Sequence, residues 1–454
     1  MLAKAHLILF LATFAVLPAL SQVEPSATGD STTTEDDSQM MTPPPVSGIP
    51  YPNMGTSVAR TNYFNAGFTG EMAYLDNVLP GETVTPVSSI TYSVLSDFSL
   101  QKTTSRQTAT LRYSPSFIFY EPTNPSESTN QLDSVDHSAS LIYQDRLSPH
   151  LGITLDDFFL RTSNVFNDSY PFTAGGLTGS SQAPVPALIA PFAEQMYDNA
   201  DAAINYQFSR NSMVGGGGSY SNFDLPNPAQ AVGLSISNGE GATAFYSRRV
   251  AAMQYAGLSY DYSRIVAGSF AAQDIEAQTH TLLPFYTIYF TRRFSLSVTG
   301  GVQRTTETQA QGTPVNSWSP SVVASMGWQG VRGNLAIDYL YAVTSGQGLY
   351  GAFRSDGASA SGGWRLSRTW NAGFTFSYNT ITALAQLTGL NFTGGTALTA
   401  EASLSRTLGE HFTASFGYQR LQENYVGIQV ISENPDSDRE YGRITYQFKK
   451  ALGR

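Results

Sequence analysis

Apolar and polar side chains alternate along this chain over segments that are long for the strands of a soluble protein. In residues 369–380, Trp370, Phe374 and Tyr378 occupy one face, and small or polar side chains occupy the positions between them. The same alternation recurs in 294–302, 331–343 and 410–420. A period of two is the pattern of a β-strand whose two faces meet different surroundings. The segments span roughly 10–14 residues, whereas strands of soluble proteins most often have ~5–6, and a tilted strand needs ~9–11 to cross a bilayer.

The composition favours a membrane-spanning sheet over a soluble one. Charged residues make up 13 % of the chain and aromatic residues 12 %, and there is no cysteine. Beyond residue 21 no segment approaches the roughly 18 consecutive apolar residues of a transmembrane helix. Because lipid offers no hydrogen-bond partner to the backbone, a closed barrel is the other structure that can span a membrane. The sequence therefore predicts an all-β fold, a transmembrane antiparallel β-barrel, while the net charge of −10 argues against nucleic acid as a partner.

Short turns join the alternating segments in pairs, and an arginine recurs beside a serine, threonine or aspartate in each turn. These turns are 144–149, 208–211, 262–265, 290–293, 366–369 and 404–409. Longer polar connections separate the pairs at 121–135, 163–197, 225–250, 306–316, 345–353, 382–393 and 423–437. Short turns at one end and long loops at the other are typical of transmembrane barrels. We expect the turn arginines to anchor the barrel at lipid headgroups.

The alternation predicts a barrel over residues 105–449, with about 16 strands and both of its ends on the short-turn side. Barrels of 14 or 18 strands are the alternatives, and 18 would follow if 62–75 and 87–100 add a hairpin. Residues 61–104 are therefore predicted to form either a periplasmic extension or extra strands. Residues 450–454 are predicted to form a C-terminal tail.

The N-terminal residues 1–21 have the pattern of a secretory signal peptide. Lys4 supplies the positive end, Leu7 to Val16 is a short apolar run, and small residues precede the expected cleavage before Gln22. Residues 22–60 are acidic and rich in serine, threonine and proline, a composition that predicts a disordered tail.

The last predicted strand, Tyr441 to Phe448, alternates aromatic and polar residues. With the architecture of residues 105–449, this strand makes the chain resemble Gram-negative outer-membrane β-barrel proteins of the porin-like class, and loosely the barrels linked to exopolysaccharide export. The resemblance implies an outer-membrane location and contact with outer-membrane lipid. It also implies that the barrel-insertion machinery recognises Tyr446 and Phe448.

Motifs that carry chemistry are sparse. The histidines beyond the signal form neither an HExxH motif nor a metal-binding pair, and they are His137, His150, His280 and His411. Gly215 to Gly218 lacks the Lys-Ser/Thr of a phosphate-binding loop, and there is no GxSxG motif. We therefore predict no catalytic residue, no metal site and no cofactor. An alternative outer-membrane hydrolase would depend on the acidic residues near His137 or farther along, which are Asp133, Asp136, Asp156 and Asp157.

Six charged residues occupy predicted strand positions between apolar neighbours. A charge that faces lipid near the midplane costs ~2–4 kcal/mol for arginine and less for acids, so we expect these side chains to face a water-filled lumen. The predicted pore-lining residues are Arg112, Asp261, Arg332, Asp338, Glu401 and Arg443. A barrel of ~16 strands is wide enough to leave an aqueous channel.

These expectations combine into a channel for the passive diffusion of small hydrophilic solutes, rather than an enzyme. The long loop 163–197 is predicted to fold into or over the lumen and constrict it, with an external cap as the alternative. The alternative function is the barrel component of an export or assembly system, in which residues 22–100 would dock a periplasmic partner.

Overall fold

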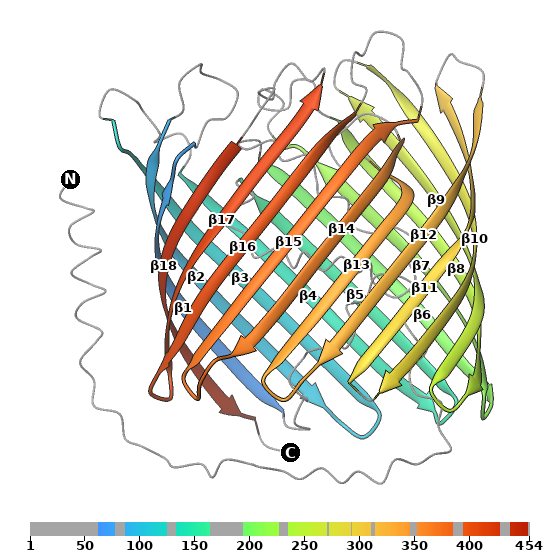
Figure 1. Ribbon diagram of the computed structural model, residues 1–454, viewed down its shortest axis with the longest axis horizontal. Coiled ribbons are helices and arrows are strands. Elements are labelled where there is room, and N and C mark those ends of the chain that lie inside the picture. The colour runs from blue at the N-terminus through green and yellow to red at the C-terminus, as the bar shows by residue number, and fades with distance from the viewer. Residues whose placement is uncertain are drawn as a thin grey trace. The chain divides into compact units, whose positions relative to one another are not determined.

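The computed structural model describes residues 62–77, 87–124, 133–163, 194–226, 235–269, 272–291, 293–309, 314–345, 352–384, 394–426 and 436–452. The regular structure in these ranges is an antiparallel sheet of 18 strands (Figure 1). The strands are β1 Tyr63–Leu75, β2 Ser89–Thr103, β3 Gln107–Pro122, β4 Ser134–Ser148, β5 Leu151–Thr162, β6 Gln195–Ser209, β7 Ser212–Asp224, β8 Ile236–Ala251, β9 Gln254–Ser269, β10 Ala272–Thr291, β11 Phe294–Gln309, β12 Val315–Gln329, β13 Gly333–Ser345, β14 Ala352–Arg365, β15 Trp370–Ala383, β16 Gly394–Leu408, β17 Phe412–Val426 and β18 Asp436–Ala451. Among the described residues, no helix is long and apolar enough to cross a bilayer.

The sheet closes on itself, because each strand pairs with its neighbours in the chain and β1 also pairs with β18. The closing register runs from Tyr63 opposite Ala451 to Leu75 opposite Arg439. Closure leaves no unpaired edge, so the backbone groups of all strands can be satisfied within the sheet. The predicted barrel is therefore confirmed, with the alternative count of 18 strands in place of 16.

The two faces of the sheet differ in chemistry, as β1 illustrates. Phe68, Met72 and Tyr74 are large apolar side chains exposed on the outer face. Glu71 and Ala73 alternate with them on the inner face and are buried. An apolar outer face around a more polar interior is the pattern of a barrel surrounded by lipid. The architecture thus agrees with the predicted outer-membrane location.

The two ends of the barrel also differ. At one end, called here the short-turn end, the strands are joined by turns such as 149–150, 210–211 and 409–411. The first strand, β1, begins at this end, and the last strand, β18, ends there. Gly409 in the last of these turns has φ = 77°, a left-handed conformation that favours glycine. At the other end, the long-loop end, the connections are mostly longer, and Figure 1 shows the tilted strands running between the two.

The barrel begins at Tyr63 and ends at Ala451, wider bounds than the predicted 105–449. Its first hairpin, β1 and β2, belongs to residues that the sequence left open between extension and extra strands. Sixteen strands follow from β3 onward, which is the number that the alternation predicted, although β8 occupies residues that were expected to form a loop. The extra hairpin considered over 62–75 and 87–100 corresponds to β1 and β2, and the short turn 104–106 joins β2 to β3.

One stretch was predicted wrongly. Residues 225–250 were expected to form a loop and 262–265 a turn, whereas β8 occupies 236–251 and Arg264 lies within β9. The sequence around Arg264 resembles the sequence around the turn arginines. Arg264 nevertheless lies on the outer face of a strand, where Glu276 at 2.7 Å and Glu240 at 3.5 Å balance its charge. The glycines of β8 hide its alternation, and a side chain at Gly241 would collide with the Ser219 hydroxyl.

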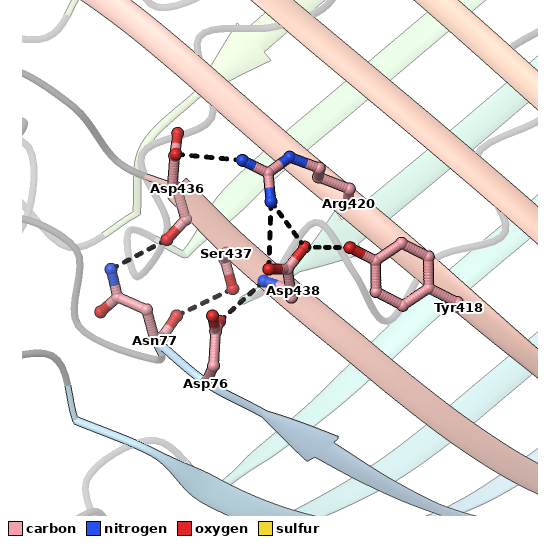
Figure 2. A network of polar contacts seen from close by, with 7 residues as sticks. All are labelled: Asp76, Asn77, Tyr418, Arg420, Asp436, Ser437 and Asp438. Atoms are coloured by element: carbon pink, nitrogen blue, oxygen red, sulfur yellow. Dashed lines mark hydrogen bonds and ion pairs between the residues drawn. The ribbon is translucent and has the colours of Figure 1, made fainter.

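The pairing of β1 with β18 closes the barrel and is called here the seam. A polar network connects the two sides of the seam at the long-loop end (Figure 2). The Asp438 backbone N–H donates to the Asp76 carboxylate at 2.7 Å, and the Asp76 N–H donates to the Asp438 carbonyl at 3.1 Å. On β17, Arg420 donates to both oxygens of the Asp438 carboxylate at 3.1 Å. The Asn77 side chain adds a bond to the Asp436 carbonyl at 3.0 Å. These contacts join the two ends of the barrel sequence at the rim.

Candidate functional site on the inner wall

The register of the sheet decides which charged side chains face the interior. Residues directly opposite each other on antiparallel strands share a face. Glu71, which is buried on the inner face of β1, lies opposite Arg443 of β18 and Ser93 of β2. Applied strand by strand, the same rule identifies the charged residues of the inner wall.

An ion cluster joins β1 to β18 on this wall. Glu71 pairs with Arg439, and both side chains are only 3 % exposed. The second Glu71 oxygen lies 3.0 Å from Nε of Arg443, whose side chain is 27 % exposed. Gln419 of β17 accepts a hydrogen bond from Arg439 at 2.7 Å. One carboxylate thus balances two guanidinium groups, of which Arg443 lies nearer to the open interior.

Tyr441 links this cluster to β16. Its hydroxyl donates to the Glu401 carboxylate at 2.7 Å, and the Arg443 guanidinium lies 4.1 Å from its ring centroid. A side chain at Gly417, opposite Tyr441, would collide with the tyrosine ring, so glycine makes room for it. Two residues predicted from the sequence, Glu401 and Arg443, are therefore brought together by a tyrosine that the charge criterion did not select.

Arg112 of β3 is an open charge of the inner wall. Its Nε lies 2.9 Å from the Asp97 carboxylate of β2, and the two side chains are 59 % and 35 % exposed. Ser114 donates a further hydrogen bond to Asp97 at 3.3 Å. A charged pair with this exposure inside a closed barrel needs water around it.

The other predicted residues do not join these clusters. Asp261 of β9 is buried on the inner face and accepts hydrogen bonds from Thr243 at 2.7 Å and Ser259 at 2.8 Å. Asp338 of β13 is half-buried. It lies opposite serines on both neighbouring strands, Ser325 and Ser359.

Arg332 does not lie on the inner wall, contrary to prediction. It occupies the turn between β12 and β13, where the Gly330 N–H donates to the Gly333 carbonyl at 2.7 Å. The apolar Val331 beside it suggested a strand position, but the glycines on both sides favour a turn.

Further acids face inward that were not among the predicted pore-lining residues, and they include Asp136, Asp156, Asp201 and Glu307. Asp156 and Asp201 lie directly opposite each other on β5 and β6. Their faces depend on the register, because Asp156 and Asp157 are neighbours in sequence and point to opposite sides. In the sequence, only the positions of the adjacent apolar residues could have indicated which of the two aspartates faces inward.

The residues suggested for a hydrolase do not assemble. His137 lies on the outer face, where its Nδ1 and the Tyr113 hydroxyl are 2.9 Å apart and the two rings stack. Asp136 faces inward and accepts hydrogen bonds from the backbone and side chain of Ser163 at 3.1 and 3.0 Å. The two side chains therefore point to opposite faces of β4. In the described part of the chain, no three His, Cys, Asp or Glu side chains gather to form a metal site.

Two other predicted features lie elsewhere. Phe448 is on the outer face and 40 % exposed, and Tyr446 contacts the Phe412 ring at 5.2 Å between centroids. Most of the predicted constricting loop, residues 164–193, lies outside the described residues.

No protein-family model matches this sequence, and no curated protein matches it either. Among solved structures, the barrel is similar to the FrpB iron transporter of Neisseria meningitidis, F3-3 variant, with a TM-score of 0.41 and 11 % identity. That match covers 81 % of this chain but only 62 % of the transporter. OccK2 (OpdF) of Pseudomonas aeruginosa, solved in complex with glucuronate, has a TM-score of 0.40 and 10 % identity, with 86 % and 98 % covered. OpdK of the same organism, solved with vanillate, has a TM-score of 0.41 and 10 % identity, with 86 % and 99 % covered.

Proposed function

We propose that this protein is an outer-membrane channel through which small hydrophilic solutes diffuse passively. The observation that carries the proposal is the exposure of charged side chains on the inner wall of a closed barrel. Arg112 is 59 % exposed there, and Arg443 is 27 % exposed. A guanidinium group in a dry interior would carry a desolvation penalty of several kcal/mol, so its exposure indicates water beside it.

The width of the barrel supports the same conclusion. Barrels of about 16–18 strands leave an aqueous channel, whereas barrels of ~8 strands fill their interior with side chains. The proposed mechanism involves no chemical step, because fixed charges along a water-filled path are sufficient to bias which solutes pass. Outer-membrane lipid surrounds the apolar face in this proposal.

Conductance of the refolded mature protein in a planar lipid bilayer tests the proposal. Discrete current steps of uniform size are expected from protein whose gel mobility changes on heating, the usual sign of an intact barrel. Heat-unfolded protein serves as the control and should give no steps. A silent bilayer with an intact barrel would contradict the proposal and favour a component of an export system.

A further inference from the structure

The inward charges of the barrel are divided between two sectors of the wall. The three residues of each strand nearest the short-turn end form the border of the barrel. Over the rest of the described strands, the inward-facing arginines are Arg112, Arg439 and Arg443. All of them lie on β3 and β18. The inward-facing acids extend around the whole barrel.

In the sector formed by β1–β3 and β16–β18, the arginines have acidic partners. Arg112 pairs with Asp97, and Arg439 and Arg443 pair with Glu71. Glu401 lies next to this cluster through Tyr441. Positive charge in this sector is therefore largely balanced at short range, which weakens its field in the lumen.

The sector from β4 to β13 has a different balance. Arg146 and Arg249 occupy inward positions at its short-turn end. Farther along the strands its inward charged residues are acids, namely Asp136, Asp156, Asp201, Asp261, Glu307 and Asp338. None of these six forms an ion pair with an arginine or lysine among the described residues. Some of these acids instead accept hydrogen bonds from hydroxyl or amide groups, as Asp261 does from the hydroxyls of Thr243 and Ser259.

Asp156 and Asp201 are the most informative members of this acidic sector. They face each other directly across β5 and β6, an arrangement in which like charges destabilise a sheet. The Asn199 amide donates to Asp201 at 2.6 Å, but this bond leaves the negative charge in place. A mobile cation in the lumen would relieve the repulsion.

From this arrangement we propose that the channel prefers cations and positively charged solutes over anions. The inference rests on the proposed channel function and adds the charge class of its solutes. Unbalanced acids along a wall of low dielectric raise the local concentration of cations and lower that of anions. All acids of this sector would contribute to the negative potential along the channel, and the Asp156–Asp201 pair would make a strong local contribution to it.

Two adjacent residues provide a matched test. Asp156 faces inward, whereas Asp157, on the same strand, is exposed on the outer face between Leu155 and Phe159. The substitutions Asp156→Asn and Asp157→Asn remove the same charge one residue apart. The reversal potential across a bilayer with a KCl gradient measures the permeability ratio of potassium to chloride for each protein.

The wild-type ratio is expected to exceed one. Asp156→Asn should move it toward one, and the double variant Asp156→Asn/Asp201→Asn should move it further, by about twofold in total. Asp157→Asn should leave the ratio unchanged. Heat-dependent gel mobility shows that each variant has formed its barrel, and Asn keeps the size of Asp, so folding should not limit the comparison.

The outcomes separate this inference from the proposed function. A conducting protein with a ratio of one or less would overturn the cation preference and leave the channel intact. Equal effects of Asp156→Asn and Asp157→Asn would overturn the role of the inner wall. An intact barrel that conducts no current would overturn the channel function and the cation preference together.

Discussion

At the scale of single residues, Glu71 is the carboxylate of a buried ion cluster. Its buried carboxylate balances Arg439, which is equally buried, and the nearby Arg443. Removing one member of a buried ion cluster leaves the other charge without compensation, which costs more than the cluster contributes when complete. The stability of the barrel should therefore be sensitive to this residue.

Glu71→Gln is expected to lower the free energy of unfolding by about 3 kcal/mol. Urea unfolding in detergent micelles, followed by tryptophan fluorescence, would measure the change. Asp97→Asn is the matched control, because its partner Arg112 is 59 % exposed and pairs of this kind contribute only ~0–1 kcal/mol. Equal effects of the two substitutions would contradict the buried role of Glu71.

Asp76, at the rim of the seam, should make stability depend on pH. Burial raises the pKa of its carboxyl group above the ordinary 3.8, and the nearby Asp438 charge adds to the effect. The folded protein therefore binds this proton more tightly than the unfolded chain. The resulting stabilisation is complete below pH 3.8 and is lost as the pH rises through the higher pKa of the folded state.

Asp76→Asn should remove this contribution while keeping an oxygen that accepts from the Asp438 N–H. The variant is expected to lose less stability than the wild type between pH 3.5 and pH 7, roughly the range over which a carboxyl group of raised pKa titrates. Parallel urea titrations at the two pH values measure the difference. An unchanged pH dependence would show that Asp76 titrates normally.

At the scale of the strands, the outward aromatic residues at the end of β18 suggest a role in assembly. Phe448→Ala and Tyr446→Ala are expected to slow insertion in cells, because we propose that the insertion machinery recognises these side chains. Refolding of the same variants into detergent should remain close to wild type. Ile444→Ala, on the same strand and face and 58 % exposed, is the control. Impaired refolding in detergent would indicate a packing role instead.

The strands show what could be read from the sequence. Alternation reveals a strand when lipid demands large apolar side chains on one face, as with Phe374, Phe376 and Tyr378 of β15. In β8 the outward positions include Ala242 and Ala244, and glycines occupy inward ones, so the pattern loses contrast. A turn resembles a strand when an apolar residue sits inside it, as Val331 does, which explains the misplaced Arg332.

The inner-wall contacts were less predictable than the strands. Charge between apolar neighbours identified Arg112, Asp261, Asp338, Glu401 and Arg443 as inward residues. Their partners depend on register and closure, and Glu71 and Arg439 are 368 residues apart in the chain. No local pattern in the sequence contains that information.

At the scale of the whole molecule, the N-terminal region divides into parts with different importance. Removing residues 22–60 from the mature protein is expected to leave the heat-dependent gel mobility and the conductance unchanged. Removing residues 22–104 should abolish the barrel, because it deletes β1 and β2 and leaves Arg439 without Glu71. Gel mobility and bilayer recordings of the two truncations would measure this. A stable barrel from the shorter chain would show that β3 and β18 can close without the first hairpin.

The ion cluster at the seam has a further consequence for assembly. Before closure, β1 and β18 are unpaired edges, and such edges can join to other chains. The first edge presents a carboxylate at Glu71, and the last presents guanidinium groups at Arg439 and Arg443. Pairing of β1 with the β1 strand of another copy would bury two carboxylates with no cation between them. The cluster therefore gives the first strand a means of discriminating between its own last strand and the first strand of a neighbouring chain.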